Sequence, residues 1–195
     1  MIVIGVDPGS INCGYGVIFF DGNSFKVLDF GIIKAKIDTK DFNDRLVKIF
    51  KELQEIIINY KANYFVIEKT FYYKNAQSLI KLSHARAAAI IAGANLGLEI
   101  IEYSPNEVKQ SVTGRGKASK EQVSYMVKTI LGLTDIDALY DASDALSMAI
   151  CHCLKYKYSL IDINKNQIQT KIKSKVNRGN NWENYIKDNP DKVKI

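Results

Sequence analysis

Four acidic residues in this 195-residue chain stand where their carboxylates could act together. Asp7 follows an apolar run at residues 2–6, and Glu68 follows another at residues 64–67. Asp141 and Asp144 lie three residues apart, a spacing that directs both side chains from one face of a helix. Because strand ends line the clefts of open α/β sheets, we expect the four carboxylates to converge at one edge.

Four converging carboxylates repel one another unless a divalent cation lies among them. Hard oxygen ligands select Mg²⁺ or Mn²⁺, whereas a zinc site would use Cys or His. Each acid alone also has a structural interpretation. Asp7 or Glu68 could be an ordinary turn residue after a strand, and Asp141 could cap a helix whose dipole Asp144 favours. The combination of the four therefore carries the hypothesis of a metal site.

The elements that must position these acids follow from hydrophobic periodicity and turn residues. Three strands that look antiparallel are followed by alternating helices and strands, which indicates a mixed α/β sheet flanked by helices. The predicted strands are residues 2–6, 14–20, 25–33, 64–67 and 99–103. The predicted helices are residues 44–60, 78–96 closed by Gly97, and 141–155.

Two further helices have well-marked starts. Ser104 is followed by Pro105 and Glu107, a capping serine with proline at the first helical position and a glutamate that can reach back. Ser119 and Gln122 repeat this capping-box pattern. The loop between the two helices, residues 113–117, is flexible and basic.

Charge is distributed unevenly along the chain, whose formal net charge is +6. Residues 1–154 carry 17 Lys/Arg and 17 Asp/Glu, whereas residues 155–195 carry 10 and 4. A basic tail suits a polyanionic partner because neutralised phosphates release counterions, although it could also be a solvated tail that aids solubility. We expect residues 159–195 to be poorly ordered or to form a short docked helix.

Other features limit the class of protein. No run approaches the ~18 consecutive apolar residues that would cross a bilayer, and the first residues lack the basic region of a signal peptide. Three cysteines, Cys13, Cys151 and Cys153, cannot form a disulfide framework and fit a reducing compartment. We therefore expect a soluble cytoplasmic protein with no membrane partner.

Three segments form a joint motif: residues 5–10 with 14–16 (GVDPGS, GYG), 67–71 with 74–76 (IEKTF, KNA), and 141–146 with 149–150 (DASDAL, AI). Together they closely resemble the RuvC family of Holliday junction resolvases. Their order and spacing match the family too, and the likeness covers residues 2–154. The resemblance implies an RNase H-like nuclease domain over residues 1–158, with Asp7, Glu68, Asp141 and Asp144 as the catalytic metal ligands.

Five further residues are candidates for DNA binding. Phe71 matches the family's aromatic residue that stacks on a base at the branch point. Lys109 and Lys120 match family lysines that contact backbone phosphate near the site. Arg115 and Lys117 occupy the intervening loop, where the family does not fix the residue types. As simple alternatives, Phe71 could be a core residue and the basic residues could be solvated surface charges.

The resemblance also implies the reaction and its partners. Two Mg²⁺ ions, replaceable by Mn²⁺ and bridged by Asp7, would activate water for in-line attack and stabilise the leaving 3′-oxygen. The products would be nicks with 5′-phosphate and 3′-hydroxyl ends, made in recombination and DNA repair. Because a four-way junction has two-fold symmetry, the family's homodimers supply two sites. A branch-migration helicase complex is a further partner in the family.

Two other classes of function fit part of the sequence. A binding module could recognise junctions without cutting them, although all four acids are present. The segment around Asp7 also resembles the phosphate-binding loop of actin-like ATPases and sugar kinases, which share the RNase H core. The chain is too short for their second domain, so a junction endonuclease is the preferred hypothesis.

Overall fold

A five-stranded mixed sheet forms the centre of the first of two units, Met1–Lys155 and Tyr156–Ile195. The computed structural model describes residues 1–69, 76–133, 140–179 and 189, with the backbone alone for residues 163–179. The strands are β1 (Ile2–Asp7), β2 (Asn12–Phe20), β3 (Phe25–Lys34), β4 (Tyr64–Glu68) and β5 (Glu99–Tyr103). All five lie where the sequence predicts them, within a few residues.

The order of the strands is β3-β2-β1-β4-β5. β1, β2 and β3 pair antiparallel, as expected of consecutive strands joined by short turns. β1 pairs with β4, and β4 with β5, in parallel, with a helix in each crossover. The predicted mixed sheet is confirmed, and its parallel half places the ends of β1 and β4 side by side.

The helices are α1 (Phe42–Tyr60), α2 (Ala76–Ala94), α3 (Pro105–Thr113), α4 (Lys120–Leu131) and α5 (Tyr140–Gly179). Both predicted capping boxes are present: Ser104 and Glu107 cap α3, and Ser119 and Gln122 cap α4. These caps satisfy backbone N–H groups that the first helical turn leaves without partners.

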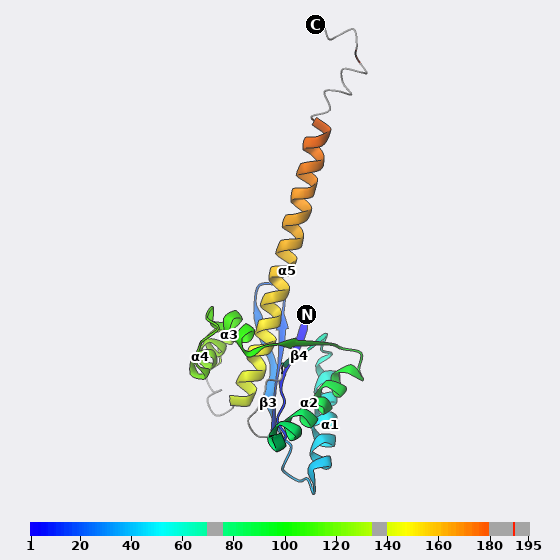
Figure 1. Ribbon diagram of the computed structural model, residues 1–195, viewed down its shortest axis with the longest axis vertical. Coiled ribbons are helices and arrows are strands. Elements are labelled where there is room, and N and C mark those ends of the chain that lie inside the picture. Colours follow the sequence, from blue (N-terminus) through cyan, green and yellow to red (C-terminus); the bar gives the residue numbers. More distant parts are fainter. Residues whose placement is uncertain (70–75, 134–139, 180–188, 190–195) are drawn as a thin grey trace. The chain divides into compact units, whose positions relative to one another are not determined.

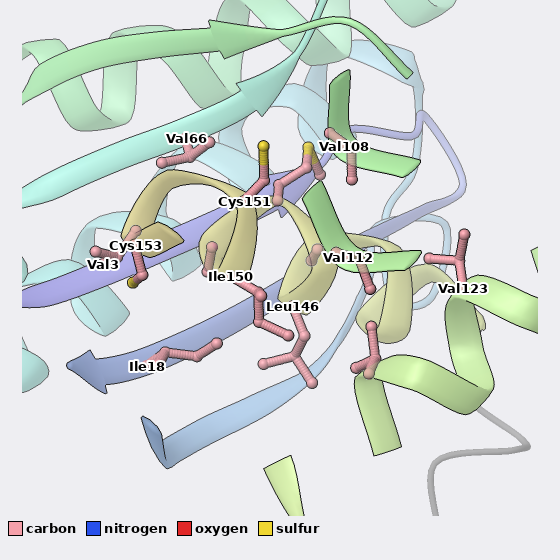
Figure 2. Packing of buried hydrophobic residues seen from close by; sticks show 14 of the residues in the cluster. Val3, Ile18, Val66, Val108, Val112, Val123, Leu146, Ile150, Cys151 and Cys153 are labelled. Carbon is pink, nitrogen blue, oxygen red and sulfur yellow. The ribbon is translucent and has the colours of Figure 1, made fainter. Parts of the chain in front are cut away.

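Two hydrophobic clusters cover the two faces of the sheet, because side chains alternate along each strand (Figure 1). Val3, Ile18 and Val66 belong to the cluster that includes α3, α4 and α5, seen from close by in Figure 2. Their chain neighbours Ile4, Val17 and Phe65 belong to the cluster that includes α1 and α2. The sheet is therefore the middle of three layers.

Helix α5 lies unusually close to β1 and β2 because three glycines face it. A Cβ built at Gly5 would stand 2.0 Å from the Ala145 carbonyl oxygen, and one at Gly14 would stand 2.1 Å from that of Asp141. A Cβ at Gly16 would stand 2.6 Å from the Leu146 side chain. We call Gly5, Gly14 and Gly16 the glycine strip. It brings the backbone of α5 directly onto the strands.

The predicted end of α5 is wrong. The sequence analysis ends this helix at Lys155, whereas its backbone is helical to Gly179. Residues 156–178 contain neither glycine nor proline, so nothing in the local sequence stops the helix even where the core cluster ends. Among the described residues, no helix combines the length and the apolar character needed to span a membrane.

Candidate active site

Asp7 and Glu68 stand next to each other at the ends of neighbouring parallel strands. Val6 pairs with Ile67 in the register of β1 and β4, so the residue that follows each of them ends its strand at the same edge. The two predicted strand-end carboxylates are therefore brought together by the sheet itself. Buried apolar residues immediately before each acid hold the strands in the core.

Asp141 and Asp144 reach this edge from α5. Gly14 pairs with Asp7 across β1 and β2, and the backbone of Asp141 lies over Gly14. Asp141 lies inside the helix, in its first turn, and not at an N-cap position. The absence of a side chain at Gly14 thus sets how near the two α5 acids come to Asp7.

The pKa values of three of these acids record burial and mutual repulsion. Burial, followed by the charges of Asp144, Glu68 and Asp141, raises the pKa of Asp7 to about 7. Burial also raises the pKa of Glu68 and of Asp144, with Asp144 adding to the effect at Glu68 and Asp141 to that at Asp144. Carboxylates with raised pKa values gain most from a nearby positive charge.

Two lysines supply positive charge at this cluster. Lys120, the first residue of α4, places its Nζ 2.6 Å from Asp144 Oδ2. Burial works to lower the pKa of Lys120, but the hydrogen bond and charge of Asp144 raise it overall. Lys109 on α3 lowers the pKa values of Glu68 and Asp144 through its charge. Both lysines therefore lie close to the carboxylates, while their predicted contact with backbone phosphate stays a prediction.

A cavity of about 180 Å³ opens where these elements meet. Its charged wall contains three of the acids and both lysines, namely Asp7, Glu68, Asp144, Lys109 and Lys120. The remaining wall is contributed by α3, α4 and α5 and is largely apolar: Pro105, Val108, Val123, Ser147 and Met148. A site of this composition can bind an anionic group at one side and exclude water at the other.

The chemistry of these donors fits a divalent cation, although the side chains do not converge on one. In the described part of the chain, no three Asp, Glu, His or Cys side chains are close enough together to hold a metal ion as they lie. The ammonium group of Lys120 instead neutralises Asp144. The donors are all carboxylate oxygens, which Mg²⁺ and Mn²⁺ prefer, and a bound cation would offset the burial and repulsion that raise these pKa values.

Of the other predicted DNA-binding residues, the two that the structure describes lie outside the cavity. Phe71 falls in residues 70–75, outside the described residues, so its role stays a prediction. Arg115 and Lys117 are exposed in the α3–α4 loop, and neither lines the cavity. Arg115 instead lines a separate pocket between α3 and α4, beside the exposed ring of Tyr125.

The sequence analysis misses the apolar wall and one arginine. Val108, Val123 and Met148 read as ordinary core positions, and their periodicity gives no sign that they border a cavity. Arg86 on α2 donates a hydrogen bond from Nε to the carbonyl oxygen of Glu68, at 3.2 Å. No motif marks this arginine, because its partners belong to strands distant in the sequence.

Comparisons with known proteins agree with one another. A family model described as crossover junction endodeoxyribonuclease RuvC matches residues 3–152. The RuvC of Chlorobium phaeobacteroides is 41% identical over 99% of both chains, and that of Citrifermentans bemidjiense is 49% identical over 78% of this chain and 92% of its own. The structure of Thermus thermophilus RuvC with a Holliday junction substrate is similar, with a TM-score of 0.76, 28% identity, and coverage of 82% of this chain and 96% of that one.

Proposed function

This chain belongs to the RuvC family of crossover junction endodeoxyribonucleases, and on that premise we propose that it resolves four-way DNA junctions by paired symmetric nicks. The family membership also identifies the fold as RNase H-like. Because the family's members are nucleases, the non-cleaving binding module and the kinase-like alternative are set aside. The products would carry 5′-phosphate and 3′-hydroxyl ends.

The observation that best supports this proposal is the cavity lined by Asp7, Glu68 and Asp144 together with Lys109 and Lys120. Three acids and two bases from five different elements meet at one sheet edge. A phosphodiester needs positive charge to bind and a negative cluster to hold a cation beside it. In this cavity the two lysines supply the positive charge, and the carboxylates supply the oxygen donors that a cation would need.

RuvC proteins are metal-dependent nucleases, and Asp7, Glu68, Asp141 and Asp144 would hold the metal in this chain. We assign Mg²⁺, with two ions per site and Mn²⁺ able to replace them, because all the candidate donors are carboxylates. Bound there, the cations would supply a polarised water and stabilise charge on the leaving oxygen. A bound cation would lower the raised pKa values of Asp7, Glu68 and Asp144, because it would offset their burial and mutual repulsion.

The chain's own basic residues would bind and orient the strand to be cut. Lys109 and Lys120 would contact phosphate oxygens on either side of the scissile bond. Lys120 Nζ, which lies 2.6 Å from Asp144 Oδ2, would be free to bind phosphate if a cation were held by Asp144. The apolar wall formed by Val108, Val123 and Met148 would exclude bulk water from the phosphate and so strengthen these contacts.

Outside the cavity, the branched substrate would need further contacts. Phe71 would stack on a base at the opened branch point, and Arg115 and Lys117 would contact phosphate from their exposed loop. The basic segment 159–195, which we treat as a region separate from the nuclease domain of residues 1–158, would add affinity without contributing to the chemistry. Its eight Lys/Arg against four Asp/Glu, an excess of four positive charges, support this role.

The assembly would be a homodimer, because a two-fold junction must be cut at two symmetric positions. Figure 1 shows α1 and α2 on the sheet face opposite α5. An apolar groove of about 350 Å³ lies between these two helices, with Val47 and Ile91 exposed in it. A second copy bound there would leave the catalytic cavity open. A branch-migration helicase complex would deliver the junction in the cytoplasm.

The decisive experiment is cleavage of a synthetic four-way junction by the full chain. Symmetric nicks that ligase can seal are expected with Mg²⁺ or Mn²⁺, and no cleavage is expected with EDTA. A linear duplex of the same sequence serves as the control for structure selectivity. Equal cleavage of duplex and junction, or cleavage in EDTA, would contradict the proposal.

A further inference from the structure

Arg86 on α2 contacts both β4, at Glu68, and β5, at Glu102. Its Nε donates to the Glu68 carbonyl oxygen at 3.2 Å, and its Nη2 lies 2.8 Å from Glu102 Oε1. Arg86 belongs to α2, Glu68 ends β4, and Glu102 belongs to β5. The arginine side chain is 14% exposed, so the guanidinium is held largely inside the protein.

Within the sheet, the Glu68 main chain is paired on the β5 side and not on the β1 side. The register of β1 with β4 ends at Val6 and Ile67, one residue before Glu68. On the β5 side, Glu68 lies opposite Tyr103, and the amide of Lys69 donates to the Tyr103 carbonyl oxygen at 2.8 Å. The Arg86 hydrogen bond therefore acts at the point where β4 leaves the sheet.

We propose that Arg86 is a positioning residue of the nuclease site, which uses Glu102 as its anchor to fix the carbonyl of Glu68 and thereby aim the Glu68 carboxylate into the cavity. This inference rests on the proposed function, in which Glu68 is a metal ligand. The planar guanidinium suits the task because its N–H groups diverge in a rigid fork and reach two acceptors at once. A lysine ammonium keeps the charge but lacks that fixed geometry.

The Arg86–Glu102 ion pair mainly fixes the position of the Arg86 guanidinium and adds little to folding stability. Glu102 is 41% exposed, and exposed ion pairs contribute little to folding stability. A one-ångström displacement of a catalytic group, in contrast, can slow a reaction by about 100-fold. Loss of an outer-shell partner typically lowers metal affinity or activity by about 10- to 100-fold. Arg86 should therefore affect the reaction more than the fold.

The test compares Arg86→Lys, Glu102→Gln and Glu68→Gln in the full chain. Four properties are measured for each: the single-turnover rate of junction cleavage, junction Kd, Mn²⁺ affinity by calorimetry without DNA, and the thermal midpoint. Glu52→Gln is the matched control, because Glu52 is 39% exposed and pairs with Lys48 on α1. It should behave as wild type in all four.

For Arg86→Lys we expect a rate and a Mn²⁺ affinity each lower by about 10-fold, with junction Kd unchanged and a midpoint within about 4 °C of wild type. Glu102→Gln should lie between Arg86→Lys and wild type, because it keeps the donor to Glu68 but loosens its anchor.

Three results would overturn the proposal, and they are distinguishable. Wild-type rate and Mn²⁺ affinity in Arg86→Lys, with Glu68→Gln inactive, would refute the role of Arg86 alone. A rate loss that disappears at lower temperature together with a lowered midpoint would make Arg86 merely structural. Full activity in Glu68→Gln would instead refute the site assignment itself, and the role of Arg86 with it.

Discussion

On one face of the sheet α5 lies against the backbone of β1 and β2, whereas on the other face large side chains hold α1 and α2 away from the strands. The first arrangement uses the glycine strip opposite Ala142, Ala145 and Ala149, all fully buried. The second uses the buried side chains of Ile4, Val6, Phe65 and Ile67.

This difference explains why the acids gather on the α5 face. A helix that contacts strand backbone has its position fixed by hard contacts, with little room for adjustment. A helix that rests on long aliphatic side chains can shift as those side chains repack. The cavity needs fixed spacing between carboxylates from a strand and from a helix. The glycine strip provides that spacing, and the opposite face carries the apolar α1–α2 groove that we propose as the dimer surface.

The largest expected effect follows from removing one α5 acid. Asp144→Asn should slow junction cleavage by more than about 100-fold, beyond the usual loss from an outer-shell partner, because it removes a charged ligand and keeps the shape. Junction Kd should change little, since Asn leaves Lys120 available for phosphate. Cleavage rate and Kd are measured on one labelled junction.

Asp162→Asn is the matched control, because Asp162 is an exposed acid on the same helix. It should cleave as wild type does. Wild-type turnover by Asp144→Asn in Mg²⁺ would show that Asp144 is not a catalytic metal ligand.

The next effect comes from filling the glycine strip. Gly14→Ala should push the start of α5 outward, because the new Cβ would meet the Asp141 carbonyl 2.1 Å away. We expect a rate loss of about 100-fold from the displaced acids and a loss of about 1–3 kcal/mol in the free energy of unfolding. Cleavage kinetics and urea unfolding measure the two quantities.

Gly93→Ala is the matched control for Gly14→Ala, because Gly93 lies on α2, on the sheet face opposite α5. There the new Cβ would meet side-chain atoms of Phe65 and Ile100 at 2.8 and 3.0 Å. Side chains can yield where backbone cannot, so stability should fall with the cleavage rate unchanged. Equal rates for both variants would mean that the strip does not set the spacing of the acids.

A smaller effect concerns pH and the buried histidine of the α5 face. Burial lowers the pKa of His152 to about 4, and its Nδ1 lies 3.0 Å from the Tyr103 hydroxyl. An unfolded histidine has a pKa of about 6.5, so the unfolded chain binds more protons between these values. Stability from neutral His152 is present above about pH 6.5 and is lost as pH falls, by about 2 kcal/mol at pH 5.

Urea unfolding of wild type and His152→Gln at pH 5 and 7.5 measures this contribution. The variant should lose less stability on acidification than wild type does. The difference between the two proteins isolates His152, because the opposing contribution of Asp7 is common to both. Equal losses would place the acid sensitivity elsewhere.

The smallest effect tests the opposite face as the dimer surface. Ile91→Ser removes an apolar side chain, 57% exposed, from the α1–α2 groove. If a second copy covers it, the dimer Kd should rise by about 10-fold, since burying an aliphatic side chain contributes about 1.5–3 kcal/mol. Sedimentation velocity over a concentration series measures the Kd. Ile58→Ser, equally exposed at 58% but not lining the groove, should leave it unchanged.

Much of the fold follows from local sequence. Alternating and continuous apolar runs predict all five strands, and capping residues fix the starts of α3 and α4 to the residue. The end of α5 is not predictable in the same way. Core-facing residues end near Lys155, but the helix continues to Gly179 because no glycine or proline interrupts it before that residue.

The sequence by itself identifies the four acids, the strands and helix that carry them, and the family of the chain. Asp7 and Glu68 end apolar strands, and the spacing of Asp141 and Asp144 places them on one helix face. The tertiary structure alone decides that Lys120 pairs with Asp144, that Arg86 holds the carbonyl of Glu68, and that Gly14 lies under Asp141. The physical reason is the separation along the chain between the residues that interact. Periodicity and capping depend on neighbours along the chain, whereas these contacts join segments that meet only when helices pack on a completed sheet.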